Sequence, residues 1–353
     1  MWTNLLFVIS NNFKVKHPES DSVDIFLENI PQISKEEIHS INLITTEQST
    51  NTLWKDLRKG RITASNFYSV YTKYNSFLRN PQTDVSSILS KLMGYQQISE
   101  NVRSLKYGRE TEPVAKQEYM KLFKLKHQNV VPKECGIFID EENVYLAASP
   151  DMLISCSCCG DGLLEVKCPM IPKCDTCSNF CTCSKPDYLS LLKDTNTLEL
   201  KKFTSYYGQV QGQMAITGRK WCDFFVYSVN GYFLQRIMFD EPFYKLIHSN
   251  IIEFYKKFVI PELITHSLES QIKNEVISHD REEEPMETED HINFTYFCPV
   301  CQRKIEDGEN VKKLSDRSVC CDKCEKWFHF KCVKQTKSLL SKTVTWFCQS
   351  CLE

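Results

Sequence analysis

Helical and strand-like patterns of apolar and polar residues alternate over the stretch from about residue 54 to about residue 267. The clearest part is the apolar, aromatic stretch 221–229, which predicts a strand. It is followed by Asn230-Gly231, the strongest short signal for a hairpin turn, and then by a returning strand. A helix is predicted over 242–260. This alternation is typical of an α/β or α+β domain.

Outside this stretch the pattern predicts less regular segments. Residues 1–47 have polar clusters and no sustained period, so we expect a lead-in of little regular structure whose apolar start forms a strand or a fragment edge. Residues 280–290 are an acidic run with a proline and too few apolar side chains to form a core. The chain therefore divides into the lead-in, a main domain over 48–267, an acidic linker over 268–293 and a small module over 294–353.

Composition changes this picture little. A length of 353 residues fits roughly two domains, and a formal net charge of -2 requires no polyanionic partner. Lys55, Arg58, Lys59 and Arg61 nevertheless form a local basic stretch that is able to attract phosphate. We predict no membrane span, since no 18 apolar residues are consecutive, and no secretory signal, since the start lacks a basic region and a cleavage site.

The 18 cysteines indicate zinc in a reducing compartment, because many stand in closely spaced pairs and no secretory signal precedes them. Near the end of the chain, four such pairs supply eight thiolate or imidazole ligands, which fill two tetrahedral zinc sites. A module this small has too little apolar core without metal, so zinc would contribute much of its folding free energy. The eight candidates are Cys298, Cys301, Cys321, Cys324, His329, Cys332, Cys348 and Cys351.

The histidine in fifth place among these ligands resembles the order in PHD fingers and departs from that in RING fingers. The resemblance implies interleaved pairs, with Cys298, Cys301, His329 and Cys332 on one ion, Cys321, Cys324, Cys348 and Cys351 on the other, and Cys320 as a spare thiol. Many PHD fingers bind histone tails. Trp327 stands where some place a wall of the cage for methylated lysine, and Phe297 is the candidate second wall. The alternative, that Trp327 packs beneath a zinc knuckle, stays open.

The main domain contains a second constellation of ligand-type residues. Asp151 is followed, after a Cys- and Gly-rich segment, by Glu165-Val166-Lys167. On a strand, Glu165 and Lys167 share one face, and Asp151 on the preceding strand reaches the same place. Two carboxylates and the Val166 carbonyl offer hard oxygen ligands for Mg²⁺ or Mn²⁺, and the lysine ammonium helps to orient or activate water for phosphodiester hydrolysis. The plain alternative is a salt-bridged surface hairpin.

The surrounding motifs resemble those of YqaJ-type viral recombinase nucleases, relatives of phage lambda exonuclease with the PD-(D/E)xK fold of restriction endonucleases. The resemblance implies a mixed central sheet flanked by helices. The resemblance covers roughly residues 52–263. Its motifs, in order, are Trp54-Lys55-Asp56-Leu57-Arg58-Lys59-Gly60-Arg61-Ile62-Thr63-Ala64-Ser65, Tyr107-Gly108-Arg109-Glu110-Thr111-Glu112, Ser149-Pro150-Asp151, Leu164-Glu165-Val166-Lys167-Cys168-Pro169 and Gln209-Val210-Gln211.

The resemblance implies specific roles for these residues. Asp151 and Glu165 would bind the catalytic metal ions with Glu112 as a further acidic partner, Lys167 would be the catalytic lysine, and Gln209 would lie beside the active site. The remaining matches, Arg58, Ser65 and Ser149, would hold the 5′ phosphate of a DNA end. For Arg58 and Ser65 the alternative is an ordinary strand-to-helix junction, with Ser65 as a helix cap.

Cysteines within the main domain depart from the phage pattern. Two groups flank the strand that carries Glu165, and they would either bind a further zinc ion or remain reduced thiols in a variable loop over 154–185. The groups are Cys156, Cys158 and Cys159, and Cys174, Cys177, Cys181 and Cys183. Three other cysteines, Cys135, Cys168 and Cys222, have apolar neighbours and are expected to be buried packing residues.

These features lead to one main hypothesis and two rivals. The main hypothesis is a nuclear, Mg²⁺-dependent 5′-to-3′ DNA exonuclease of viral or mobile-element origin that acts on linear duplex ends in recombination and is targeted to chromatin by a histone-reader PHD finger. One rival is a catalytically silent chromatin-binding adaptor, and the other is a structure-selective endonuclease. Because phage relatives form ring trimers, a homo-oligomer is a further hypothesis.

Overall fold

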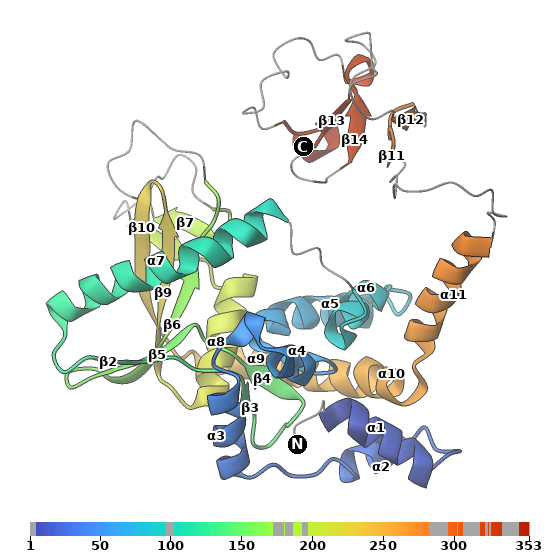
Figure 1. Ribbon diagram of the computed structural model, residues 1–353, viewed down its shortest axis with the longest axis horizontal. Coiled ribbons are helices and arrows are strands. Elements are labelled where there is room, and N and C mark those ends of the chain that lie inside the picture. The colour runs from blue at the N-terminus through green and yellow to red at the C-terminus, as the bar shows by residue number, and fades with distance from the viewer. Residues whose placement is uncertain are drawn as a thin grey trace. The chain divides into compact units, whose positions relative to one another are not determined.

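The computed structural model describes residues 5–96, 102–171, 180, 186–192, 197–281, 296–301, 303–305, 318–321, 324, 326–333 and 346–352. The chain forms two compact units, Met1–Arg281 and Glu282–Glu353 (Figure 1). Among the described residues, no helix is both long enough and apolar enough to cross a membrane.

The first unit is built on a five-stranded mixed sheet with the strand order β10-β9-β6-β5-β2. β6 and β9 run parallel with Glu165 opposite Phe224, and the other neighbours are antiparallel. The hairpin predicted around Asn230-Gly231 connects β9 to β10, and Gly231 adopts the positive φ of 106° that the turn requires. The strands are β2 (Val131–Lys133), β5 (Met152–Cys156), β6 (Gly160–Lys167), β9 (Trp221–Ser228) and β10 (Gly231–Met238).

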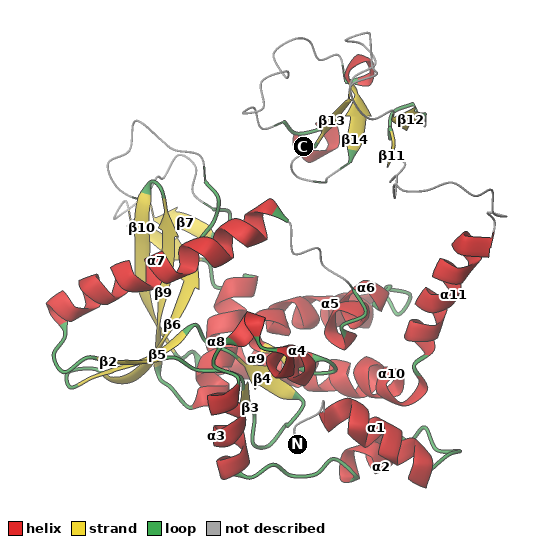
Figure 2. Cartoon of the chain, viewed as in Figure 1, coloured by secondary structure: helices red, strands yellow, loops and turns green. Residues whose placement is uncertain are grey.

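Helices cover both faces of this sheet, as Figure 2 shows. On one face, helix α7 (Arg103–Lys126) packs Ala115, Tyr119 and Phe123 against apolar side chains that include Leu164 and Val166. On the other face lies a larger core that includes residues of α5, α8 and α9. The fold class predicted from the sequence, a mixed central sheet flanked by helices, is therefore confirmed. The helices on the second face are α5 (Phe67–Arg79), α8 (Ser205–Thr217) and α9 (Glu241–Phe254).

The prediction of a loosely ordered lead-in was wrong. Its described residues form three helices, and residues 5–16 are helical where a strand or fragment edge was expected. Leu6, Phe13 and Phe26 are almost fully buried in the main core, whereas Ile41 joins a separate cluster. Short helices separated by polar turns leave no long apolar period, and only tertiary packing reveals their buried faces. The helices are α1 (Leu5–Lys16), α2 (Val23–Glu28) and α3 (Lys35–Ile44).

A second sheet, with the order β1-β4-β3, adjoins this region. Helix α4 (Thr52–Arg58) precedes β1 (Ile62–Thr63), and β1 pairs in parallel with β4 (Leu146–Ala148), which leads directly to Asp151. The sheet therefore joins the basic stretch to the acidic centre. Other elements of this unit are η1 (Gln48–Thr50), η2 (Ala64–Asn66), α6 (Ser86–Met93), β3 (Phe138–Ile139), the antiparallel pair β7 and β8 (Leu189–Leu192, Thr197–Leu200), η3 (Tyr255–Val259) and α10 (Ile260–Thr265).

The segment expected to begin the acidic linker is helical as far as Arg281. Helix α11 (Ser267–Arg281) is anchored by the buried Glu262, whose carboxylate accepts hydrogen bonds from the Leu268 and Glu269 N–H groups at 2.9 and 3.1 Å. An acidic side chain at a helix N-terminus satisfies amide groups that have no partner within the helix. Residues 282–293 of the predicted linker lie outside the described residues.

In the described part of the second unit, two short antiparallel strand pairs surround a small core of cysteines, Ile305, Phe328 and Trp346. Phe328 and Trp346 pack edge to face, with ring centroids 5.4 Å apart. A core of this size agrees with the expectation that metal is needed for folding. Its elements are β11 (Tyr296–Phe297), β12 (Lys304–Ile305), β13 (Ser318–Cys320), β14 (Trp327–His329), η5 (Phe330–Cys332) and α12 (Gln349–Leu352).

Candidate functional site

Asp151, Glu165 and Lys167 meet where β5 begins and β6 ends. Asp151 stands one residue before β5, and its Oδ2 accepts a hydrogen bond from the Val166 N–H at 2.6 Å. Glu165 and Lys167 lie two residues apart on β6, so their side chains share one face. Lys167 Nζ lies 2.5 Å from Glu165 Oε1, and Glu165 is buried. The structure thus brings together the three residues expected to form the centre.

Two glutamines of α8 donate hydrogen bonds to the Glu165 carboxylate. Gln209 Nε2 donates to Oε1 at 2.6 Å, and Gln213 Nε2 donates to Oε2 at 2.7 Å. The two glutamines are four residues apart, one helical turn, so they face the same way. Both carboxylate oxygens are therefore fixed in direction.

Two glycines set the position of α8. A Cβ atom at Gly212 would lie 2.5 Å from Phe67 Cδ2, and one at Gly208 would lie 2.8 Å from Tyr68 Cβ. Because glycine has no Cβ, α8 approaches the start of α5 more closely than other residues would permit. This close packing fixes the depth at which the α8 glutamines reach the sheet.

The charged side chains at this centre shift the pKa of Asp151 and Lys167. Loss of solvent around its carboxylate, together with the negative charges of Glu165 and Glu112, raises the pKa of Asp151 well above its ordinary value. Burial disfavours the charged form of Lys167, but Glu165 and Asp151 outweigh that effect and raise the pKa of Lys167. The ammonium also lies 4.8 Å from the centroid of the Tyr206 ring. Lys167 is therefore a cation at neutral pH.

Glu112 reaches the same region from α7. Lys116, one turn further along α7, lies 3.0 Å from Glu112 Oε1 and 3.5 Å from Glu134 Oε2. Burial opposes its charge, but Asp151 and Glu112 raise the pKa of Lys116. A cavity of about 580 Å³ along α7 is lined in part by Glu112, Lys116 and Glu134. The structure thus places Glu112 near Asp151 and adds Lys116 to the set.

Arg58 is linked to the acidic centre through Trp54. Its guanidinium carbon lies 4.1 Å from the centroid of the Trp54 ring, and Trp54 Nε1 donates to Ser149 Oγ at 2.9 Å. The Ser149 carbonyl in turn accepts from Gln213 Nε2 at 3.4 Å. Burial lowers the pKa of Arg58 to about 10, which leaves it charged at neutral pH. A continuous set of contacts therefore joins Arg58 to Glu165.

A cavity of about 420 Å³ opens beside Arg58 and is also lined by Lys55, Lys59, Thr63 and Asn66. Ser65 is exposed, and its Oγ lies 3.1 Å from Thr63 Oγ1. Ser65 lies within η2 and does not cap it, because the N-cap position belongs to Thr63.

Arg61 differs from the other members of the predicted basic stretch. It is almost fully buried and donates to the carbonyl oxygens of Val144 and Leu57. It therefore joins α4 to the turn before β4 instead of contributing exposed charge.

The oxygen ligands of the centre fit a hard divalent cation. Asp151 and Glu165 lie close enough for their negative charges to disfavour each other, and a cation between them would relieve that repulsion. Carboxylate oxygens are the ligands that Mg²⁺ and Mn²⁺ prefer. The Val166 amide already positions Asp151, while the carbonyl of the same residue is the third predicted ligand.

The second unit gathers two sets of four ligands. In each set, one ligand atom from every residue lies within 4.8 Å of the others. The pairs interleave as the PHD resemblance implies. The sets are Cys298, Cys301, His329 and Cys332, and Cys321, Cys324, Cys348 and Cys351. Four thiolate or imidazole ligands in a closed set are typical of structural zinc.

Trp327 is half-buried and packs against the small core of the second unit, together with several of the predicted zinc ligands. This contact agrees with the alternative that Trp327 supports a zinc knuckle. The side chain of Phe297, the other candidate cage wall, lies outside the described residues.

The internal cysteines form a set that sequence reasoning identified only in part. Cys156, Cys158 and Cys159 lie together, but their fourth partner is His127 at the end of α7. The other predicted ligands, Cys174, Cys177, Cys181 and Cys183, lie outside the described residues. Cys135 and Cys222 are fully buried as expected, and Cys168 is half-buried.

A family model described as the YqaJ-like viral recombinase domain matches residues 53–220, which include Arg58, Glu112, Asp151, Glu165 and Gln209. The chain carries a YqaJ-like viral recombinase domain. A second model, the PHD finger, matches residues 298–351. Both families recognised in the sequence are therefore confirmed.

Two curated relatives match the PHD finger. The proteins named PHD finger protein ALFIN-LIKE 7 from Oryza sativa subsp. indica and subsp. japonica are each 36% identical to this chain over 56 residues. The match covers 16% of this chain and only 18% of the length of each relative.

Three similar solved structures are described as exonucleases. The alkaline exonuclease LHK-Exo from Laribacter hongkongensis is 26% identical, with a TM-score of 0.41, over 66% of this chain and 100% of its own. The Shutoff and Exonuclease Protein from Kaposi's sarcoma-associated herpesvirus is 12% identical, with a TM-score of 0.43, over 72% of this chain and 81% of its own. A phage-related exonuclease from Haemophilus somnus 129PT is 13% identical, with a TM-score of 0.37, over 61% and 96%.

Within the YqaJ-like domain, sequence reasoning missed several residues that support the centre. Gln213 was detectable, because it follows Gln209 by one helical turn. Lys116 follows Glu112 at the same spacing. Trp54 and Tyr206 gave no such signal, since their roles depend on contacts with Ser149 and Lys167 from distant parts of the chain.

Proposed function

We propose that this protein is a Mg²⁺- or Mn²⁺-dependent nuclease that degrades linear duplex DNA from the 5′ end. The observation that carries the proposal is the meeting of Asp151, Glu165 and Lys167 on one face, joined by hydrogen-bonded and stacked side chains to Arg58. This combines a cation site with a guanidinium that is suited to a terminal phosphate. The YqaJ-like match supports the same assignment.

The residues of the centre would have different roles in the reaction. Asp151 and Glu165 would hold the cation, which supplies Lewis-acid activation of water and stabilises charge on the phosphate. Gln209 and Gln213 keep Glu165 in one orientation. Lys167 remains protonated, so its role is to orient water and offset negative charge in the transition state rather than to remove a proton.

End recognition would involve Arg58, Ser65 and Ser149. A phosphate monoester at a 5′ end carries more negative charge than an internal phosphodiester, and the planar fork of Arg58 can donate two hydrogen bonds to it. Stacking on Trp54 leaves few orientations open to the guanidinium. The basic cavity beside Arg58 would receive the terminal nucleotide.

The enzyme claim is tested with purified full-length protein and a linear duplex that carries 5′ phosphates. Nucleotides should be released in the presence of Mg²⁺ and not in EDTA, and Glu165→Gln or Lys167→Ala should abolish release. Equal release by the wild type and both variants would refute the assignment of the centre. No release by the wild type in either Mg²⁺ or Mn²⁺ would favour the catalytically silent adaptor.

A second comparison separates end-dependent digestion from internal cutting. A covalently closed circle should remain intact, whereas the same DNA after linearisation should be degraded. Cutting of the circle would favour the structure-selective endonuclease. Labels placed at the 5′ or 3′ end give the polarity, and the 5′ label should be released first.

The PHD finger is proposed to bring this activity to chromatin in the nucleus, which would fit a role in recombination of a viral or mobile element. Its ligand sets support zinc binding, and a histone tail is the proposed partner. Titration of the full chain with unmodified and lysine-methylated histone-tail peptides tests this. Because Trp327 packs on the core, Trp327→Phe should be used to preserve packing while weakening a methyl-lysine cage. Absence of binding to every peptide would remove the targeting proposal.

Size measurements in solution would test a homo-oligomer.

A further inference from the structure

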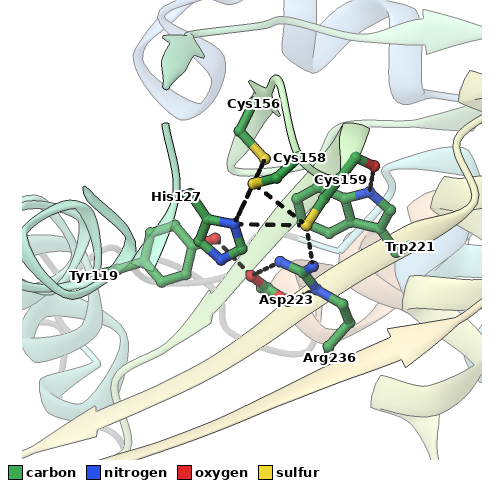
Figure 3. A network of polar contacts seen from close by, with 8 residues as sticks. All are labelled: Tyr119, His127, Cys156, Cys158, Cys159, Trp221, Asp223 and Arg236. Carbon is green, nitrogen blue, oxygen red and sulfur yellow. Dashed lines mark hydrogen bonds and ion pairs between the residues drawn. The ribbon is translucent and has the colours of Figure 1, made fainter. Parts of the chain in front are cut away.

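A second cluster of soft ligands lies in the first unit, at the tip of the β5–β6 hairpin. Cys156 ends β5, and Cys158 and Cys159 form the turn before Gly160 begins β6. His127 is the C-terminal cap residue of α7 and lies 29 residues before Cys156 in the chain. Figure 3 shows the imidazole and the three sulfur atoms directed toward one another.

The separations within this cluster match those around tetrahedral zinc. Bond lengths of about 2.3 Å to sulfur and about 2.0–2.1 Å to nitrogen place two sulfur atoms about 3.8 Å apart and sulfur about 3.6 Å from nitrogen. His127 Nδ1 lies 3.1, 3.6 and 3.5 Å from the sulfur atoms of Cys158, Cys156 and Cys159. Cys158 Sγ lies 3.4 Å from Cys156 Sγ and 3.9 Å from Cys159 Sγ.

Neither disulfides nor thiol hydrogen bonds explain this arrangement well. The three cysteines are free, and their sulfur atoms are much further apart than the roughly 2.05 Å of a disulfide. A single imidazole nitrogen is able to form only one good hydrogen bond, yet three sulfur atoms converge on it. A bound cation would give all four groups a common partner, and thiolates with imidazole select zinc among the available metals.

The surroundings also suit a zinc site with three thiolates. Such a site carries a net charge of about −1, because three thiolate charges exceed the charge of Zn²⁺. Arg236 Nη1 lies 3.2 Å from Cys159 Sγ and offsets this charge, while Asp223 accepts from the Nε and Nη2 atoms of Arg236 at 2.8 and 2.9 Å. Trp221 Nε1 donates to the Cys159 carbonyl at 3.0 Å. Groups that support ligands in this way are typical of metal sites.

The imidazole itself is held in place. The His127 ring stacks on Phe123, with centroids 3.9 Å apart and an angle of 16° between the ring planes. The next residue, Gln128, accepts hydrogen bonds from both the N–H and the Oγ of Ser157 at the hairpin tip. Contacts between protein atoms therefore hold the end of α7 against the hairpin without a bound ion.

We propose that His127, Cys156, Cys158 and Cys159 bind a structural zinc ion that fastens the end of α7 to the tip of the β5–β6 hairpin. The site is separate from the PHD ligand sets and from the nuclease centre. It joins the helix that carries Glu112 to β5, which follows Asp151, and to β6, which carries Glu165, so it stabilises the frame on which that centre is built. The proposal does not depend on the protein's being a nuclease.

Zinc content measured on the purified full-length chain provides the first test. Cys158→Ser should lose about one zinc ion per chain relative to the wild type. Cys158 is exposed, so its substitution removes a ligand without opening the core. Cys320→Ser is the matched control, because Cys320 belongs to none of the three ligand sets, and it should keep the zinc content of the wild type. Unchanged zinc content in Cys158→Ser would overturn the proposal.

A second test uses the wild-type chain and needs no variant to fold. Iodoacetamide labelling followed by mass spectrometry should find Cys158 protected as purified and labelled after a chelator removes zinc, both with and without a reductant. An exposed free thiol would be labelled at the same rate in both states, and a disulfide would remain protected without reductant after chelation. Either of those results would overturn the proposal.

Discussion

Replacement of Gly212 by alanine tests whether close packing of α8 positions the centre. The new Cβ would lie 2.5 Å from Cδ2 and 2.7 Å from Cε2 of Phe67, and 3.2 Å from the Ala64 Cβ. Phe67 is fully buried, so its ring cannot move without displacing other core side chains. Helix α8 must therefore shift away from α5, which withdraws Gln209 and Gln213 from Glu165.

The expected size of this effect follows from two opposing contributions. Overpacking of a core costs about 1–3 kcal/mol, and the short distances at Gly212 favour the upper part of that range. Replacing glycine by alanine inside a helix recovers about 1 kcal/mol. The net loss in the free energy of unfolding should therefore be about 1–2 kcal/mol, which corresponds to a Tm lower by about 2–8 °C.

Thermal unfolding and nuclease assays on the same preparations check this prediction. Gly108→Ala is the matched control, because a Cβ there meets nothing within 4 Å on helix α7, and it should raise stability by about 0.5–1 kcal/mol. Activity of Gly212→Ala should fall even at temperatures where the variant is fully folded. A Gly212→Ala protein as stable and as active as the wild type would refute the packing argument.

Three further predictions concern the centre and its cations. Gln213→Leu should reduce kcat about tenfold to hundredfold, because a hydrogen bond to a charged group contributes about 1.5–3 kcal/mol; an unchanged kcat would contradict this prediction. The control Gln211→Leu, which loses contacts to Met238 and Asp240, should lower Tm instead. Because the pKa of Asp151 is raised, a bound cation displaces a proton from its carboxyl group below that pKa. As the pH rises, the Kd for Mg²⁺ measured by calorimetry should therefore fall about tenfold per pH unit and level off above that pKa, and a pH-independent Kd would count against this coupling. Arg58→Lys keeps the charge but loses the planar fork, so the ratio of rates on 5′-phosphorylated and 5′-hydroxyl duplexes should approach one. An unchanged ratio would exclude Arg58 from end recognition.

Features that depend on neighbouring residues were predictable from the sequence. The shared face of Glu165 and Lys167 follows from strand periodicity, and the β9–β10 hairpin follows from Asn230-Gly231. The family motifs also led to Asp151, Gln209 and Arg58, which the structure connects through short contacts. Such signals are local, because the ligand spacing, the alternation of side chains and the turn residues all lie within a few positions of each other.

The tertiary structure alone decided the features that join distant segments. The N-terminal residues such as Leu6 and Phe26 looked like a polar lead-in, yet they complete the main core. His127 carries no ligand signal of its own, because its three cysteine partners come about thirty residues later, after β2, β3 and β4. Arg61 has the composition of a surface charge, but the carbonyl groups of Leu57 and Val144 hold it inside. A sequence shows which residues can bind metal, donate hydrogen bonds or be buried, whereas the choice among their partners depends on packing between elements that are far apart in the chain.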